Sequence, residues 1–187
     1  MEQAEALEIM LDGNSVILCG EGGSGKSFTL RQFIERNRLL GRKTAVTATT
    51  GLAASHLNGQ TLHSWARVGL GKELPDDWQF TISKKKRKEL QTTATLVIDE
   101  VSMMPDFVFD MLDAVLRWAR NDDRPFGGIQ LILCGDFYQL PPVEGRFITN
   151  SKVWNELSIR SCYLTKVYRQ KDDRLRDLLA GVRGGNL

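Results

Sequence analysis

The sequence lacks the features that would place it in a specialised class of protein. No apolar run reaches the roughly 18 residues that a membrane span needs, so no transmembrane segment is expected. The first residues, MEQAEALEIMLDG, are acidic and amphipathic, without the basic and apolar regions of a signal peptide. No internal repeat occurs, and a short lysine run is the only low-complexity segment. A chain of 187 residues is then expected to form one globular domain, 1–187, with one sizeable core.

The sequence also has few cysteines and a small net charge. Cys19, Cys134 and Cys162 are too scattered for a metal-ligand pattern, and two of them end apolar runs, which favours buried free thiols in a reducing compartment. The net charge of +2 would not by itself hold the chain on a polyanion. The local clusters are the basic stretch 160–187 and the five cations 84–88. A solvated helix face is the favoured interpretation of 84–88, with a phosphate contact as the alternative.

Short apolar runs alternate with amphipathic segments along the chain. The runs predict buried strands, which we place at 15–19, 43–48, 95–98, 129–133 and 162–164. Helices are predicted at about 4–12, 27–40, 82–91, 105–120 and 175–182, and residues 50–92 are the least clear region. This alternation predicts an α/β fold with a mainly parallel sheet flanked by helices on both faces. In such sheets ligands bind at the carboxyl ends of the strands, which is where the polar motifs of this chain fall.

The strongest motif is Gly20–Ser27 (GEGGSGKS), which fits G-x-x-x-x-G-K-[ST] between a predicted strand and a predicted helix. Its glycines let successive backbone N–H groups turn toward a phosphate at the start of the helix. Lys26 is expected to reach the β- and γ-phosphates, and the Ser27 hydroxyl to bind Mg²⁺. The residues expected around the nucleotide are Gly22, Gly23, Ser24, Gly25, Lys26, Ser27 and Phe28. An ordinary glycine loop before a helix is the alternative.

Two carboxylates end the apolar run LVIDE. Asp99 is placed to hold Mg²⁺ directly or through water, and Glu100 to orient or deprotonate an attacking water. Capping of the following turn is the alternative interpretation. NTPases that hydrolyse commonly keep the second acid, so the pair favours hydrolysis over transfer of the phosphate to an acceptor.

Small hydroxyl residues follow the second strand in TATTGLAA. Thr47, Thr49 and Thr50 could cap a helix or hold a polyanion backbone, and the sequence does not decide between these roles. His63, in GQTLHSW, is by residue type more often structural than functional.

The stretch CGDFYQLPPV is heavily stiffened, since Pro141 and Pro142 fix φ and remove two N–H donors. Its strand is predicted to share a sheet with the strand ending at Asp99, so Gln139 should emerge beside the carboxylates. A glutamine held by such a loop can detect whether a phosphate oxygen is present. Packing is favoured for Phe137, whereas Tyr138 could pack or face a partner.

Taken together, GEGGSGKS, TATTGLAA, GQTLHSW, IDEVSMM, GDFYQLPPV and LTKVYRQ resemble, in this order, the motifs of the petite-integration-frequency (Pif) helicases. These are relatives of RecD in helicase superfamily one, which move 5′ to 3′ on single-stranded DNA and serve DNA replication, repair, recombination and telomere maintenance. The resemblance implies a RecA-like motor domain, with ATP and Mg²⁺ as cofactors and single-stranded DNA and DNA forks as partners, and no membrane.

The resemblance also implies roles for single residues. Gln3 would recognise adenine, Gln139 would contact the γ-phosphate, and Arg169 would be a second γ-phosphate contact. DNA contacts would come from Thr47, Thr49, Thr50, His63 and Tyr138. A bacterial or phage cytoplasm is the favoured compartment, with the nucleus or mitochondrion for a eukaryotic source.

One departure from the family pattern concerns the length of the chain. Helicases of this superfamily have two RecA-like domains with ATP between them, and no second half follows within these 187 residues. The chain is therefore expected to be the first motor domain, weakly active or inactive when isolated. A P-loop phosphotransferase and a nucleotide-gated DNA-binding module with negligible turnover are the two alternatives.

Overall fold

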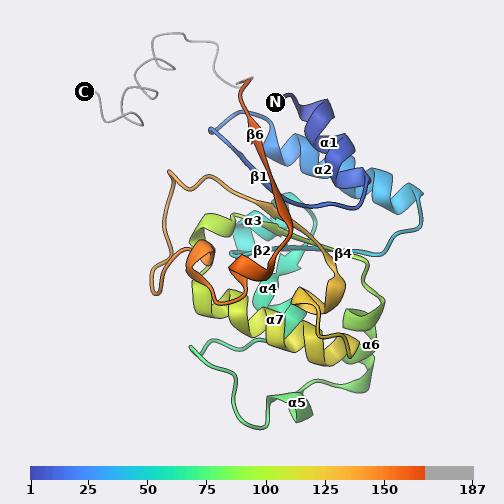
Figure 1. The fold of residues 1–187 in the computed structure, drawn as a ribbon, viewed down its shortest axis with the longest axis vertical. Helices are drawn as coiled ribbons and strands as arrows, with labels where there is room; N and C mark the ends of the chain where they lie inside the picture. The colour runs from blue at the N-terminus through green and yellow to red at the C-terminus, as the bar shows by residue number, and fades with distance from the viewer. Residues whose placement is uncertain (167–187) are drawn as a thin grey trace.

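The computed structural model describes residues 1–166 and shows helices and strands in alternation (Figure 1). The strands are β1 Ser15–Gly20, β2 Thr44–Ala48, β3 Gln60–Thr61, β4 Thr95–Asp99, β5 Gln130–Cys134 and β6 Ile159–Leu164. The helices are α1 Gln3–Leu11, α2 Lys26–Leu39, α3 Gly51–His56, α4 Leu62–Ala66, α5 Trp78–Thr81, α6 Lys84–Thr92 and α7 Asp106–Arg120. Short 3₁₀ turns lie at Val101–Met103, Pro125–Gly128, Ile148–Asn150 and Trp154–Glu156.

Within the described residues one sheet forms, with the strand order β3-β2-β4-β5-β1-β6 and parallel pairing throughout. The chain leaves β1 and returns as β2 on the far side of the positions that β5 and β4 later fill. Because the strands are parallel, all their carboxyl ends lie at one edge of the sheet. The loops after β1, β4 and β5 therefore emerge side by side there, at the position where open α/β sheets bind ligands.

Each face of the sheet is buried under helices. Alternate residues of β4 point to opposite faces, so that Leu96 and Ile98 pack with α4, α6 and α7, whereas Val97 packs with α1 and α2. Figure 1 shows the same two layers, with α1 and α2 together on one side and α4, α6 and α7 on the other. Burial on both faces explains why these strands read as continuous apolar runs instead of alternating ones.

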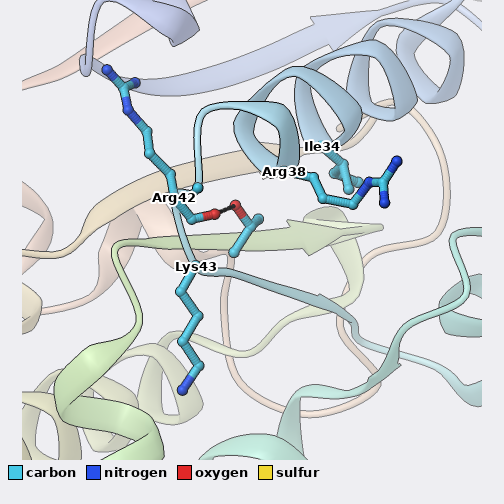
Figure 2. A pocket seen from close by; sticks show the side chains of 6 residues that line it. Ile34, Arg38, Arg42 and Lys43 are labelled. Atoms are coloured by element: carbon cyan, nitrogen blue, oxygen red, sulfur yellow. Dashed lines mark hydrogen bonds between the residues drawn. The ribbon is translucent and has the colours of Figure 1, made fainter.

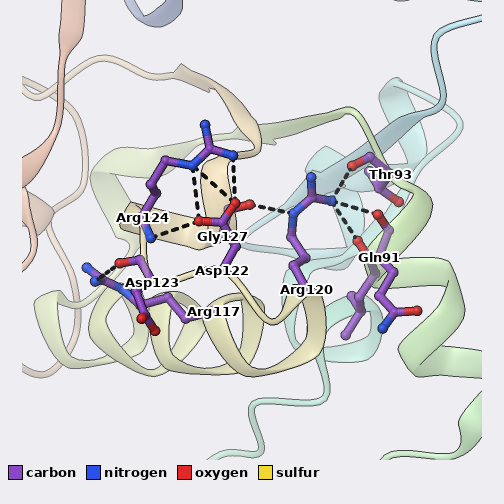
Figure 3. Close-up of polar contacts among 9 residues, drawn as sticks. Gln91, Thr93, Arg117, Arg120, Asp122, Asp123, Arg124 and Gly127 are labelled. Carbon is purple, nitrogen blue, oxygen red and sulfur yellow. Dashed lines mark hydrogen bonds and ion pairs between the residues drawn. The ribbon is translucent and has the colours of Figure 1, made fainter.

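Helix α7 connects several loops through its polar side chains (Figure 3). The Arg120 guanidinium donates to the carbonyls of Gly127, at 2.6 Å, and of Leu90, Gln91 and Thr93, at 3.2, 2.9 and 2.8 Å. Two turns earlier, Asp113 accepts hydrogen bonds from Arg117 and from the backbone N–H of Phe126. The end of α6 and the turn before β5 are thus fixed to the same helix.

The predicted α/β fold with a parallel sheet is confirmed, and the predicted strands fall within one or two residues of β1, β2, β4 and β5. β6 begins three residues earlier than expected, at Ile159. The unclear region 50–92 contains α3, β3, α4, α5 and α6. The last predicted helix, 175–182, lies outside the described residues.

The cysteines and the basic helix follow their predictions in part. The thiols are free, with Cys134 and Cys162 buried and Cys19 half-buried. In α6, Lys84, Lys85 and Lys88 are exposed as expected for a solvated face. Arg87 is different, since its guanidinium lies 4.3 Å from the centre of the Trp118 ring. Among residues 1–166, no helix is long and apolar enough to cross a membrane.

Candidate nucleotide-binding site

The loop between β1 and α2 has the geometry of a phosphate-binding loop. Gly25 is the N-cap residue of α2 with φ 89°, a left-handed conformation that glycine adopts without strain. The Lys26 side chain folds back across the loop, where its Nζ donates to the carbonyls of Gly20 at 2.7 Å and Glu21 at 3.1 Å. The loop thus presents an ammonium group and the start of a helix to the same space, a combination suited to phosphate.

Gln3 packs directly against this loop from the first turn of α1. Its Nε2 donates to the Ser24 carbonyl at 3.1 Å. A Cβ on Gly25 would lie 1.9 Å from the Gln3 amide nitrogen, so any side chain at position 25 would displace Gln3 from the loop. The predicted adenine contact of Gln3 remains a prediction, but its side chain does lie against the phosphate loop.

The two acids at the end of β4 have different environments. Asp99 is 8% exposed, and its Oδ1 accepts the backbone N–H of Glu100 at 2.9 Å. Glu100 has φ 53° and ψ 42°, a left-handed conformation that is strained for a residue with a side chain. Burial raises the pKa of Glu100, and the charge of Asp99 raises this pKa further, while Lys26 opposes the change. Glu100 therefore binds a proton more readily than an exposed carboxylate.

The loop after β5 brings Gln139 to the same edge of the sheet. Pairing of β4 with β5 places Asp136 and Gln139 beside the acids, as the sequence predicted. The Gln139 Nε2 donates to Asp136 Oδ2 at 3.2 Å, and Asp136 is 3% exposed. Phe137 packs edge-on against Phe147 with ring centres 5.5 Å apart, whereas Tyr138 is 73% exposed. The favoured packing of Phe137 is thereby confirmed.

These elements surround one open cavity of about 720 Å³. Its lining includes the predicted residues Gly22, Gly23, Gly25, Lys26, Ser27, Phe28, Asp99, Glu100 and Gln139, together with Thr50. Segments up to 117 residues apart in the chain, from Gly22 to Gln139, therefore meet in one space. Ser27 and Asp99 supply a hydroxyl and a carboxylate oxygen, the ligand chemistry that Mg²⁺ takes when it also binds phosphate oxygens.

The predicted DNA contacts fall into different environments. Thr47 is 1% exposed and donates to the Val97 carbonyl at 2.7 Å, so its side chain joins β2 to β4 and offers no surface to a ligand. The prediction of a DNA contact is corrected for this residue. Thr49 donates to the Glu100 carbonyl at 3.0 Å, and Thr50 caps α3. His63 is half-buried, and burial lowers its pKa.

Two residues that the sequence interpretation did not single out also belong to this edge. Asp136 is the partner of Gln139, and nothing in the sequence distinguishes it from an ordinary turn acid. Ser102 lines the cavity, and its fully buried hydroxyl has no hydrogen-bond partner among the described residues. Its position in IDEVSMM, two residues after Glu100, was the available signal. Arg169 lies outside the described residues.

A second hollow, of about 340 Å³, lies at the end of α2 and the start of β2 (Figure 2). Three cations line it, but they point apart in the figure, and each has a partner elsewhere. Arg42 donates to the Leu11 carbonyl at 2.9 Å, Lys43 to the Thr92 hydroxyl at 2.7 Å, and Arg38 pairs with Glu35 at 2.7 Å. This hollow lies at the amino end of β2 and presents no converging set of ligands.

Comparisons with known proteins agree on one family. The sequence model described as PIF1-like helicase matches residues 2–179. The chain is 40% identical to the ATP-dependent DNA helicase Pif1 of a Psychrobacter species and 41% identical to human ATP-dependent DNA helicase PIF1, covering 100% and 98% of this chain. It spans only 31% and 29% of those two proteins.

Solved structures give the same result. The crystal structure of Pif1 helicase from Candida albicans has a TM-score of 0.92 and 40% identity, over 99% of this chain and 44% of that one. Pif1 helicase from Bacteroides in complex with ADP-AlF3 and single-stranded DNA has a TM-score of 0.91 and 32% identity, over 99% and 46%. The described sheet is therefore that of a Pif1 RecA-like domain.

Proposed function

Because the chain belongs to the PIF1-like helicase family, we propose that it is the ATP-binding motor domain of a 5′-to-3′ DNA helicase. The observation that carries the proposal is the convergence of Lys26, Ser27, Asp99, Glu100 and Gln139 on one cavity. A phosphate-binding loop, a carboxylate pair and a stiffened glutamine loop are the parts that hydrolysis of a nucleoside triphosphate requires. Relatives with this domain are named as ATP-dependent DNA helicases.

The residues of the cavity fit Mg²⁺-ATP. Ser27 and Asp99 would hold the cation, which supplies neutralisation of charge on the phosphates. The Lys26 ammonium, now bound to the carbonyls of Gly20 and Glu21, would exchange one or both of these for phosphate oxygens. The family resemblance supports an adenine contact for Gln3, whose side chain packs against the phosphate loop.

Glu100 would orient the attacking water and accept its proton. Its left-handed backbone is fixed on both sides, by Thr49 at the Glu100 carbonyl and by Asp99 at the Glu100 N–H. Such fixing positions the carboxylate before the nucleotide arrives, which lowers the reorganisation needed during the reaction. Gln139 would sense the γ-phosphate, and Arg169 would contribute a second positive contact.

Single-stranded DNA and a second RecA-like domain are the proposed partners. Structures of relatives are described with single-stranded DNA and at forked double-stranded DNA, and this chain covers under half of each of those proteins. Thr49, Thr50, His63 and Tyr138 are the proposed DNA contacts, and of these Tyr138 is highly exposed. We propose a bacterial or phage cytoplasm as the compartment, or the nucleus or mitochondrion for a eukaryotic source.

The test is ATP turnover by the full-length protein with and without single-stranded DNA. Stimulation by DNA, and its loss in Lys26→Ala, are the expected results. Lys43→Ala is a matched control, because this lysine lines the second hollow and its ammonium is bound to Thr92. Turnover that ignores DNA, or that survives in Lys26→Ala, would rule out the proposed function. The isolated chain is expected to bind nucleotide but to turn it over slowly.

A further inference from the structure

The side chain proposed to sense the γ-phosphate is already engaged in this structure. Gln139 Nε2 donates to Asp136 Oδ2 at 3.2 Å, three residues back along the same loop. The Gln139 backbone N–H also bonds to the Asp136 carbonyl, at 2.9 Å, so both ends of the glutamine are connected to one residue. The Gln139 amide nitrogen carries a second N–H group, but the hydrogen bond to Asp136 restricts the directions in which the side chain can present that group to a phosphate.

Asp136 is held too firmly to follow the glutamine toward a ligand. It is 3% exposed, and its Oδ1 accepts the Tyr138 backbone N–H at 3.2 Å. The preceding residue, Gly135, donates to the Leu18 carbonyl at 3.2 Å in β1. A Cβ on Gly135 would lie 3.1 Å from the Ser102 backbone nitrogen, so the segment after the acids packs closely against it. The carboxylate therefore stays with the sheet, while the exposed Gln139 side chain can turn away.

We propose that Asp136 is a positioning residue that holds Gln139 in a resting orientation, from which a γ-phosphate, but not the diphosphate product, releases it. This inference rests on the proposed function, since it assigns a resting state to the proposed sensor. ATP would exchange the Asp136–Gln139 hydrogen bond for one between Gln139 and the γ-phosphate. ADP has no γ-phosphate, so Gln139 would remain on Asp136 when ADP is bound. The hydrogen bond then opposes ATP binding and leaves ADP binding unchanged.

Two other effects of Asp136 must be separated from this one. Its carboxylate shapes the turn by accepting the Tyr138 N–H, and its negative charge lies near Glu100 and the space for the phosphates. Removal of the charge should strengthen binding of every nucleotide, and most strongly of the more highly charged ATP. That electrostatic effect does not depend on Gln139, whereas the proposed restraint acts only through Gln139.

A double-mutant cycle separates the effects. Asp136→Ser keeps a hydroxyl that can accept the Tyr138 N–H but is too short to hold the glutamine. It is made in the wild-type and in the Gln139→Ala full-length protein, and the dissociation constants of a non-hydrolysable ATP analogue and of ADP are measured for all four. The quantity compared is the preference for the ATP analogue over ADP.

Asp136→Ser is expected to raise the preference for the ATP analogue over ADP in both backgrounds. The increase should be about fivefold larger in the wild type than in Gln139→Ala, which is the effect of one hydrogen bond. Equal changes in the two backgrounds would mean that Asp136 acts through charge or turn structure alone, and would overturn the proposal. If the serine variant does not fold, Asp136→Asn replaces it. A neutral partner holds an amide less strongly than a carboxylate does, so roughly a twofold difference is then expected, and no difference overturns the proposal.

Failure of this proposal is distinguishable from failure of the proposed function. Lys26→Ala is measured in the same binding experiment. If Lys26→Ala weakens nucleotide binding but the cycle shows no coupling, only the role of Asp136 is lost. If Lys26→Ala leaves nucleotide binding unchanged, the cavity is not the nucleotide site, and both proposals fail.

Discussion

The cavity at the carboxyl edge of the sheet and the polar network of α7 contain similar residue types in opposite conditions. Along α7, charged side chains are bonded to fixed partners, as Asp113 is to Arg117 and the Phe126 N–H. In the cavity, Lys26 lies on backbone carbonyls, Glu100 has a left-handed backbone, and the buried Ser102 hydroxyl has no described partner. The side chains along α7 hold the fold through partners in other segments, whereas Lys26, Glu100 and Gln139 line an open cavity where a ligand can reach them.

The difference follows from what each region must do. A network such as that of Arg120 gains stability because every hydrogen bond is made in the folded protein. A binding site that was equally satisfied would have to break those bonds for its ligand. Mutations in the two regions should therefore separate activity from stability.

The largest expected effect tests the cavity side of this comparison. Lys26→Ala should lower ATP turnover by about 10²- to 10³-fold, because an ammonium aimed at the phosphates is lost. Its melting temperature should stay close to that of the wild type, since the bonds lost are only those from Nζ to two carbonyls of the loop. Turnover assays and thermal unfolding measure both. A large drop in melting temperature would show that Lys26 is a structural residue like those of α7.

The next effect tests the α7 side. Arg120→Ala removes the donor to four carbonyls and should cost about 2–4 kcal/mol of folding free energy, or roughly 5–10 °C in melting temperature. Nucleotide affinity measured well below the melting temperature should be unchanged. Arg124→Ala is the matched control, because among residues 1–166 this exposed guanidinium pairs only with Asp122. Equal destabilisation by both variants would mean that the hydrogen bonds of Arg120 stabilise the fold no more than a surface ion pair does.

A smaller effect tests whether the strain at Glu100 is functional. Glu100→Gly should abolish DNA-stimulated turnover yet stabilise the fold by about 1 kcal/mol relative to Asn121→Gly. Asn121 is the matched control, since it too has φ 53°, at the end of α7, and asparagine tolerates this conformation better than glutamate does. Chemical denaturation gives the two stabilities. Destabilisation by Glu100→Gly would show that the left-handed backbone is no reservoir of strain.

The sequence was sufficient for β1, β2, β4 and β5 and for the motifs that follow them. Continuous apolar runs such as Leu96–Ile98 occur because both faces of the sheet are covered, and a parallel sheet brings the residues after each strand to one edge. The positions of Asp99 and Gln139 beside the phosphate loop follow from that geometry alone. These were the parts of the site that local pattern and topology determine together.

Side-chain partners far apart in the sequence could not be predicted in the same way. The hydroxyl of Thr47 was expected near DNA, but it points into the sheet because Val97, 50 residues later, supplies its acceptor. The four carbonyls that Arg120 binds belong to segments on both sides of α7. Such contacts depend on packing, which no periodicity in one segment encodes.

The smallest expected effect concerns the exposed pair Asp122–Arg124, whose contribution should appear only at low pH. The hydrogen bond from the Arg124 side chain, with one from the Arg124 N–H, lowers the pKa of Asp122 from 3.8 to about 2. A depressed carboxyl pKa adds stability that is fully present above the unfolded value of 3.8 and is lost as the pH falls through about 2. Asp122→Asn and Arg124→Ala should therefore have similar free energies of unfolding at neutral pH. It should, however, show a shallower loss of urea resistance than the wild type as the pH is lowered through this window. Identical pH profiles would mean that this ion pair does not persist in solution, in contrast to the partly buried contacts of Arg120.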